Sequence, residues 1–400
     1  MTIMPSLLTL CDRNRPTPIL PLWFLVTFLL LTSAASFASR SRGRKASSNA
    51  DRLGGDGFGK SPAKAYIPDT SNKIQELISF LGDEECEGIG PAQGTEIGFH
   101  PTTLVRGLYA CKTFEAGDFL LGIPFPACLT LAVDDVTERE TSDAELGLRL
   151  LQRILTTEHQ QQQQPDYGAY LHCLPTRDQQ FDASPDFWSE DEINSLEFPP
   201  LIERAKQRKL ETLRMATTHQ VNPDQLQFAT WLVKSRGFTL LKPVRFEALP
   251  ETTGAGLPYP DGGTIMSKTV MIPYLDMINH SSEKANTELQ VLETKAEEES
   301  MYALQALCHI PKGSEITLCY GSGQESSVEM FSNYGFCTVN NPNDITLMNS
   351  WKDYVWSTSI EQDEAELKLI MNDRKGVDKV RIKVLDFRLQ MKLSQAELEG

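Results

Sequence analysis

Three short motifs, in a fixed order along the second half of the chain, constrain its fold more than any other feature. Residues 274–282 read YLDMINHSS, residues 315–321 read EITLCYG, and residues 334–336 read YGF. Each motif alone carries little information, because an Asn-His or Tyr-Gly pair arises by chance in many chains of this length. Their order and spacing in one chain indicate a shared site.

Length and charge limit the class of protein. The chain has 400 residues, of which 40% are hydrophobic, so it can bury one large core or two smaller ones. Its net charge is −16, and because residues 1–50 carry a surplus of five positive charges, the remainder carries about −21. This acidity argues against a broad nucleic-acid surface and favours basic or lysine-bearing protein partners.

The cysteines are dispersed, with no Cys-x-x-Cys pair and no Cys/His cluster at zinc spacing, so we predict no metal site. Scattered cysteines in a chain of this length are more often buried free thiols than a disulfide framework, which predicts a reducing final compartment. The eight are Cys11, Cys86, Cys111, Cys128, Cys173, Cys308, Cys319 and Cys337.

The N-terminus has the anatomy of a targeting leader. Residues 19–31 form an apolar run of thirteen, preceded by Arg13 and Arg15 and followed by small residues, as in a secretory signal peptide. Thirteen residues rise only ~20 Å as a helix, which is too short for a bilayer core of ~30 Å. Including residues 34–38 would bring the run close to spanning, so a signal anchor is an alternative.

Residues 36–48 are rich in Ser and Arg and contain no acidic residue, as transit peptides do. A signal peptide followed by such a stretch, with Phe37 at the junction, resembles the bipartite leader of proteins sent to complex plastids in algae. The alternative is a signal peptide with a disordered basic tail, which leaves the protein in the secretory pathway. In both cases residues 1–60 lie outside the fold and end in a glycine-rich linker.

The body mixes helices and short strands irregularly. The spacing of apolar residues predicts a helix at 71–84, and short β-like pieces are expected at 103–105, 108–110 and 118–124. A helical region is expected from about residue 140 to 235, opened by a capping box at Ser142 to Glu145. No long helix follows each strand, which excludes a doubly wound α/β sheet.

The elements after this helical region carry the motifs. Asn222-Pro223 is a good helix start, and that helix leads to Ser235-Arg236-Gly237-Phe238. A Pro/Gly-rich loop at 243–264 and a strand at 270–272 precede the Asn-His motif. Ser326 to Glu329 caps a helix that ends at Gly335.

In this order the elements and motifs resemble the Rubisco large-subunit lysine methyltransferase branch of the SET-domain family. The likeness covers about residues 75–345 and includes Tyr170-Leu171, Leu174-Pro175 and Phe187-Trp188 in the helical region. It implies an α+β fold of short curved β-sheets with a helical insert. The cysteine-rich zinc segments of many histone-directed relatives are missing from this sequence, as in this branch of the family.

The resemblance also implies a domain organisation. A leader and linker would occupy residues 1–60, and the SET domain residues 61–340 with its insert at about 140–235. The family has a helical C-terminal substrate-binding domain, for which only residues 341–400 remain. We therefore expect that region to be short or incomplete.

The cofactor implied by the resemblance is S-adenosylmethionine. Arg106, Gly107, Leu108 and Tyr109 would form its first binding loop, where glycine lets the backbone approach a ligand closely. Arg236 would bind the cofactor carboxylate with its fork-shaped cation. Taken alone, the first group is an ordinary strand-initiating turn and Arg236 is a surface arginine at a helix C-terminus.

The later motifs would complete the site. Asn279 would hold the amino and carboxylate end of the cofactor, His280 would support the adenine, and Phe336 would lie against it. An isolated histidine after an apolar run is otherwise a core residue, and His280 is not read as a general base without reach to the substrate. Tyr320 is the predicted catalytic tyrosine, with its hydroxyl beside the transferring methyl group and the amine.

Phe238 and Tyr334 would line the channel for the substrate lysine. Family members can place another aromatic residue in the strand after Asn-His, but residues 286–292 contain none. The number of methyl groups added is therefore not defined by these residues, because channel width and polarity set it.

We therefore predict a protein-lysine N-methyltransferase that acts on a non-histone protein, as a monomer, without nucleic acid and with membrane contact only through an uncleaved leader. The Rubisco large subunit and a plastid aldolase are candidate substrates by family analogy. The alternatives are protein-histidine methylation, a catalytically silent SET fold used as a binding module, and a membrane-anchored α+β protein whose motif matches are accidental.

Overall fold

The computed structural model describes ten segments of the chain. These are residues 66–82, 94–135, 140–159, 167–177, 183–244, 264–282, 284–294, 300–338, 341–372 and 378–398. The predicted leader, the glutamine run at 160–164 and most of the loop at 243–264 lie outside them. No helix within these segments is long and apolar enough to cross a membrane.

The chain divides into two compact units, one of residues 59–100 and 106–400 and the other of residues 1–58 and 101–105. In the second unit only residues 101–105 are described, and they form a turn. Leu104 has a φ of 55°, and the Val105 N–H donates to Thr103 Oγ1 over 3.3 Å. The strand predicted at 103–105 is therefore wrong, because a left-handed residue at its centre bends the chain. The other elements belong to the first unit.

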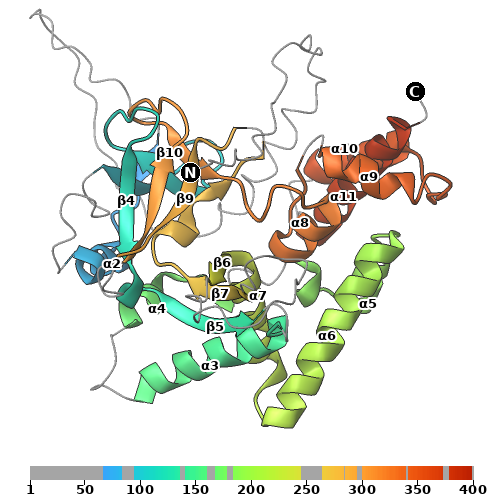
Figure 1. The fold of residues 1–400 in the computed structure, drawn as a ribbon. Helices are drawn as coiled ribbons and strands as arrows, with labels where there is room; N and C mark the ends of the chain where they lie inside the picture. The colour runs from blue at the N-terminus through green and yellow to red at the C-terminus, as the bar shows by residue number, and fades with distance from the viewer. Residues whose placement is uncertain are drawn as a thin grey trace, which may run out of the picture. The chain divides into compact units, whose positions relative to one another are not determined.

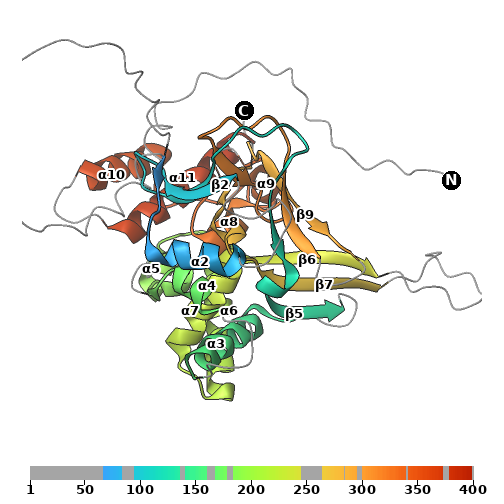
Figure 2. The ribbon, with the colours of Figure 1, turned by 90° about the vertical axis from the view of Figure 1, so that its left-hand side faces the viewer.

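Three small sheets form the β part of the fold (Figures 1 and 2). The five-stranded sheet has the order β1 (Ile67–Pro68), β2 (Thr95–Phe99), β3 (Arg106–Ala110), β11 (Glu315–Leu318), β8 (Asn279–His280). The second sheet has the order β4 (Phe119–Pro124), β10 (Met301–Ala306), β9 (Thr287–Leu292), and the third β5 (Leu129–Asp135), β7 (Thr264–Met271), β6 (Gly237–Val244). This confirms the predicted α+β class with short sheets.

Strand pairing is antiparallel except between β8 and β11, which run parallel. The predicted strand at 270–272 is in fact the end of a longer strand, β7, which pairs with β5 on one side and β6 on the other. Its polar residues Ser267 and Thr269 are buried between these neighbours, which is why an apolar pattern did not reveal them.

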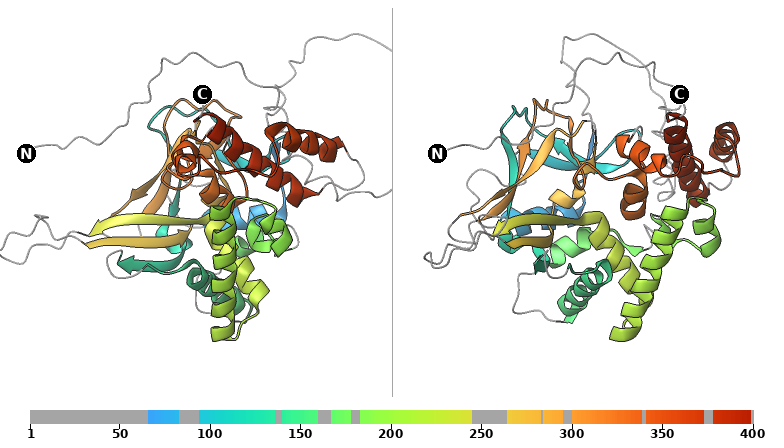
Figure 3. Two further views of the ribbon diagram at one scale, coloured as in Figure 1. Left: turned by 90° about the vertical axis from the view of Figure 1, so that its right-hand side faces the viewer. Right: turned by 45° about the vertical axis from the view of Figure 1, so that its right-hand side comes forward.

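The helices fall into two groups by position along the chain. The first comprises α2 (Asn72–Gly82), α3 (Asp143–His159), α4 (Gly168–Cys173), α5 (Glu190–Asn194), α6 (Pro199–His219) and α7 (Pro223–Arg236). The second comprises α8 (Ser327–Tyr334), α9 (Pro342–Asn349), α10 (Ile360–Asn372) and α11 (Lys379–Ala396). Helix α7 packs against α3 and α6, and α11 packs against α8, α9 and α10 (Figure 3).

The predicted helix starts are confirmed. Ser142 and Glu145 exchange backbone-to-side-chain hydrogen bonds of 3.0 and 3.4 Å at the start of α3. The Asn222 side chain accepts bonds from the first turn of α7. Helix α8 opens with a capping box at Ser326 and ends at Gly335, whose φ of 76° is the left-handed conformation that glycine adopts readily.

The buried residues form two cores. The larger one joins the sheets to α2, α3, α4 and α7, and the smaller one, around Trp188, Phe198, Phe331 and Phe387, joins α5 and α6 to α8, α9 and α11.

Cysteine exposure differs from the prediction most clearly at two of the six described positions, while Cys111 and Cys337 are partly buried. Cys128 and Cys173 are buried free thiols, as predicted, whereas Cys308 and Cys319 are free but exposed. Both exposed residues follow strands, where the chain turns outward. The prediction of buried thiols therefore fails for them.

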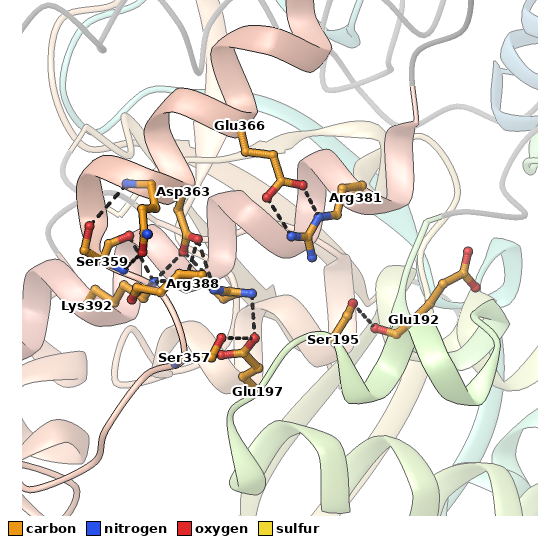
Figure 4. A network of polar contacts seen from close by, with 12 residues as sticks. Glu192, Ser195, Glu197, Ser357, Ser359, Asp363, Glu366, Arg381, Arg388 and Lys392 are labelled. Atoms are coloured by element: carbon orange, nitrogen blue, oxygen red, sulfur yellow. Dashed lines mark hydrogen bonds and ion pairs between the residues drawn. The ribbon is translucent and has the colours of Figure 1, made fainter.

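A buried charge network fastens the C-terminal helices to the turn after α5 (Figure 4). The Asp363 carboxylate of α10 accepts bonds from Arg388 Nε at 3.1 Å and Lys392 Nζ at 2.5 Å, both on α11. Arg388 Nη1 also donates to Glu197 Oε1 at 2.9 Å. The side chains of Asp363 and Arg388 are only 1% and 2% exposed. Each charge therefore depends on its partners, since little water reaches it.

Replacement of Asp363 tests this dependence. Asp363→Ala leaves two cations with reduced counter-charge, and we expect it to lower the free energy of unfolding by about 3–5 kcal/mol. The control is Glu364→Ala on the same helix, which removes an exposed pair with Lys368 and should cost about 0.5 kcal/mol or less. Urea denaturation measures both values, and equal losses would contradict the buried role of Asp363.

Candidate functional site

The parallel pairing of β8 with β11 brings the first two motifs together. Asn279 lies opposite Thr317, and His280 lies opposite Leu318. The second motif therefore leads directly from this pairing to Tyr320. Residues that are about forty positions apart in the sequence become neighbours in one sheet.

A strained turn precedes β8. Tyr274 is buried and has a φ of 71°, which is unusual for a residue with a side chain, and a 3₁₀ turn at Leu275–Met277 follows it. The Tyr274 hydroxyl donates to Thr95 O at 3.3 Å on β2. Such strain is typical of functional sites, where the surrounding structure enforces it.

Asn279 connects three strands. Its Nδ2 donates to Arg106 O at 3.0 Å on β3 and to Glu315 Oε1 at 2.7 Å on β11. A Cβ at Gly107 would lie 2.7 Å from Glu315 Oε1 and 2.8 Å from Asn279 Nδ2. The lack of a side chain at Gly107 is therefore required for this amide to hold its position.

His280 is held as a neutral hydrogen-bond donor. The Tyr320 N–H donates to His280 Nδ1 at 2.9 Å, which places the proton of the neutral ring on Nε2. Burial lowers the pKa of His280, and Glu325 opposes that effect. Nε2 is buried and has no hydrogen-bond partner among the described residues. The atom can therefore donate to a ligand, but it cannot accept a proton from one.

Four rings lie together where Tyr320 meets the third motif. The ring of Tyr320 lies 5.1 Å from that of His280 and 4.9 Å from that of Tyr334, measured between centroids. Phe336 lies 5.8 Å from His280 and 5.9 Å from Tyr334. We call these four residues the aromatic group. It brings together the predicted catalytic residue, two predicted cofactor residues and one predicted channel residue.

The tyrosines of this group stay protonated at neutral pH. The Tyr320 hydroxyl donates to the backbone carbonyl of Ile278. Burial raises the pKa of Tyr320 well above its ordinary value, although Arg236 opposes the shift. Burial also raises the pKa of Tyr334 to about 12. Both phenols can therefore orient a ligand by hydrogen bonding, but neither serves as a base.

Arg236 is placed by a buried aspartate. Its Nη1 donates to Asp276 O at 3.0 Å and lies 3.5 Å from Asp276 Oδ2, and the Tyr170 hydroxyl donates to the same Oδ2 at 3.0 Å. Burial raises the pKa of Asp276, while the Arg236 guanidinium lowers it. Arg236 Nε is buried and has no hydrogen-bond partner among the described residues. This donor can bind an anionic group of a ligand.

The remaining predicted residues are less directly placed. Residues 106–109 form β3 rather than a loop, and Leu108 and the Tyr109 ring, which stacks on Tyr66 at 4.4 Å, belong to the core. Arg106 Nη2 donates to Cys173 O at 3.3 Å. Phe238 of β6 lies opposite Val270 of β7 and packs against the larger core. It is not part of the aromatic group.

Sequence reasoning assigned no role in the site to four polar residues that build it: Tyr170, Asp276, Asn286 and Glu315. Asp276 lies inside the first motif, where an acid within an apolar run was a usable signal. Asn286 donates to Glu315 O at 2.8 Å and accepts the Thr317 N–H at 2.9 Å, so its amide continues the pairing of β11. No local signal identifies this role, because the partners are about thirty residues away.

The site is suited to a ligand with an anionic end and a flat ring. Arg236 Nε and His280 Nε2 are buried donors without partners in the described segments. Gly107 leaves room for the Asn279 amide and Glu315 beside β3, and the ring of Phe336 offers a stacking surface near His280. These features fit the cofactor that the sequence resemblance implies, with its carboxylate and its adenine.

Comparison with known proteins identifies a family for the chain and supports its fold. The sequence model of the SET domain matches residues 105–321, which is more than half of the chain. The structure is similar to the SET domain of LSMT, crystallised with lysine and AdoHcy, with a TM-score of 0.56 and 13% identity. The match covers 83% of this chain and 91% of that one. No curated protein matches significantly in sequence. At this identity the structural likeness shows the fold alone.

Proposed function

The chain belongs to the SET-domain family, and we propose that it is a protein-lysine N-methyltransferase that acts on a non-histone protein. SET methyltransferases use S-adenosylmethionine, so the cofactor follows from the family. The observation that carries the proposal is the parallel β8–β11 pairing, which places Asn279 and His280 beside the strand that leads to Tyr320.

The residues of this chain would hold the cofactor as follows. Arg236 Nε would donate to its carboxylate. Asn279 would hold the same end through its side-chain oxygen and its backbone, because its Nδ2 already donates to Arg106 O and Glu315 Oε1. His280 Nε2 would donate to the adenine, against which Phe336 would stack. When bound, S-adenosylmethionine supplies a methyl group on a positively charged sulfur. A neutral amine can take this methyl group, and the sulfur leaves as an uncharged thioether.

The amine must lose its proton before it can react. A free lysine has a pKa of about 10.4, so a neutral amine at pH 7 costs roughly 4.6 kcal/mol. The rings of Tyr320 and Tyr334 provide low polarity, which favours the neutral amine. Because the pKa values of both phenols are raised, neither removes the proton, which would instead pass to water before the amine reacts. Tyr320 would instead align the amine and exclude water.

Transfer of a labelled methyl group tests the proposed function. We expect purified native protein, incubated with fractionated cell extract and labelled cofactor, to methylate a lysine amine, which mass spectrometry locates. Tyr320→Phe should lower the turnover rate about a hundredfold, because the reacting atoms lose alignment, and should leave cofactor affinity nearly unchanged.

Three outcomes would contradict parts of this proposal. Label on a histidine would replace the lysine assignment with histidine methylation. Absence of label with native protein that binds the cofactor would favour a silent SET fold used for binding. Equal loss of turnover and cofactor affinity in Tyr320→Phe would remove its catalytic role.

We further propose that the protein is delivered to a plastid, with the Rubisco large subunit or a plastid aldolase as candidate acceptors by analogy. Support comes from residues 1–60, in which an apolar run is followed by a Ser- and Arg-rich stretch without acidic residues up to Asp51. The acidic remainder of the chain also favours a basic or lysine-bearing acceptor.

A fluorescent fusion tests the leader. Residues 1–60 fused to a reporter should accumulate in the plastid of a cell with complex plastids, because the signal part and the transit part act in sequence. The matched control lacks residues 36–48 and should remain in the secretory pathway. Retention of the complete leader in the secretory pathway would contradict plastid delivery.

A further inference from the structure

The last turn of α8 carries the aromatic residues of the third motif. Tyr334 is the final residue of this helix, and Phe336 follows Gly335 directly. Helix α8 contacts both α6 and α11, which lie far from it in the sequence (Figure 1). The positions of these two rings therefore depend on the contacts that residues 332–335 make with other elements.

Arg208 of α6 donates hydrogen bonds to residues 332–333 of this last turn. Its Nη2 donates to Ser332 Oγ at 2.7 Å and also to Ser332 O, and its Nη1 donates to Asn333 Oδ1 at 3.2 Å. Its Nε donates to Asp186 Oδ1 at 2.7 Å. The Arg208 side chain is only 8% exposed. Each nitrogen of the guanidinium therefore has an acceptor, and Nη1 and Nη2 together have three acceptors on the turn.

The other end of this arrangement is also fixed. Asp186 accepts the Ser184 hydroxyl at 3.1 Å and, through its backbone carbonyl, a bond from Gln227 of α7. A buried, paired carboxylate holds the guanidinium plane in one orientation, since Arg donors form a rigid fork. Arg208 thus links α8 to a segment that is itself tied to α7.

A second contact holds the turn from α11. A Cβ at Gly335 would lie 1.6 Å from Ala183 O, so the glycine and this carbonyl are in direct contact. Lys383 Nζ donates to the same carbonyl at 2.8 Å. Lys383 therefore holds the carbonyl group against which Gly335 packs. Gly335 is the residue between Tyr334 and Phe336, so this contact also limits where the two rings lie.

We propose that Arg208 and Lys383 are positioning residues, which set the placement of Tyr334 and Phe336 and so tune methyl transfer from outside the site. This inference rests on the proposed function. Small misplacement of reacting groups costs more in turnover than in folding stability, because alignment within about 1 Å affects rates up to a hundredfold. If Arg208 and Lys383 only stabilised the fold, their replacement would lower folding stability without a larger loss of turnover.

The test uses variants that keep a positive charge beside Asp186. Ser332→Ala combined with Asn333→Ala removes two acceptors from the turn, and Lys383→Met removes the second contact. Arg208→Lys keeps the charge but loses the fork. The matched control is Arg204→Gln, since Arg204 also joins α6 to α8 but through an exposed pair with Glu329 at 4.0 Å.

We expect kcat to fall about tenfold in the three positioning variants, with KM for the protein substrate within about twofold, and no change in the control. The ring signal of Tyr334 in ¹³C-tyrosine-labelled, ligand-free protein, identified with Tyr334→Phe, should shift in the variants and not in Arg204→Gln.

An unchanged kcat and an unchanged Tyr334 signal in well-folded variants would overturn the inference, and so would a loss confined to thermal stability. If native protein transfers no methyl group, the proposed function fails, while the Tyr334 signal still decides whether Arg208 and Lys383 position the ring.

Discussion

The pairing of β8 with β11 is the constraint on which the site depends. It is the parallel contact among otherwise antiparallel neighbours in the described sheets, and it places Asn279 and His280 beside the strand that leads to Tyr320. The Asn279 amide then bridges both strands to β3, across the position where Gly107 has no side chain. If this pairing shifted by one residue, Asn279 and His280 would exchange faces, and His280 could no longer receive the Tyr320 N–H.

The protonation states of the site follow from its burial. Burial lowers the pKa of His280 and raises those of Tyr320 and Tyr334, so the aromatic group is uncharged at neutral pH. Arg236 provides a cation beside this group, and Asp276 and Tyr170 hold it in place. An uncharged aromatic surface beside a fixed cation suits a reaction that needs alignment and a deprotonated amine rather than a protein base.

Local features of the site could be predicted from the sequence, while long-range ones could not. The caps at Ser142, Asn222 and Ser326 depend on neighbouring residues, and the sequence patterns indicated them correctly. The contacts of Asp276 with Tyr170 and of Arg208 with Ser332 join residues more than a hundred positions apart. No periodicity or motif records such a pair. The turn at Leu104 escaped prediction for a different reason, because a β-branched and apolar stretch reads as a strand until its backbone is known.

Binding of S-adenosylhomocysteine, the demethylated product of the cofactor, measured by calorimetry tests the central claim most directly. We expect one molecule to bind per native chain, and Gly107→Ala to weaken binding at least about tenfold, because the new methyl group intrudes on the Asn279 amide and Glu315. Gly82→Ala is the matched control, since a Cβ there meets nothing within 4 Å, and it should bind as the native protein does. A folded native protein that binds no product, or a Gly107→Ala variant that binds as tightly as the native protein, would contradict the account.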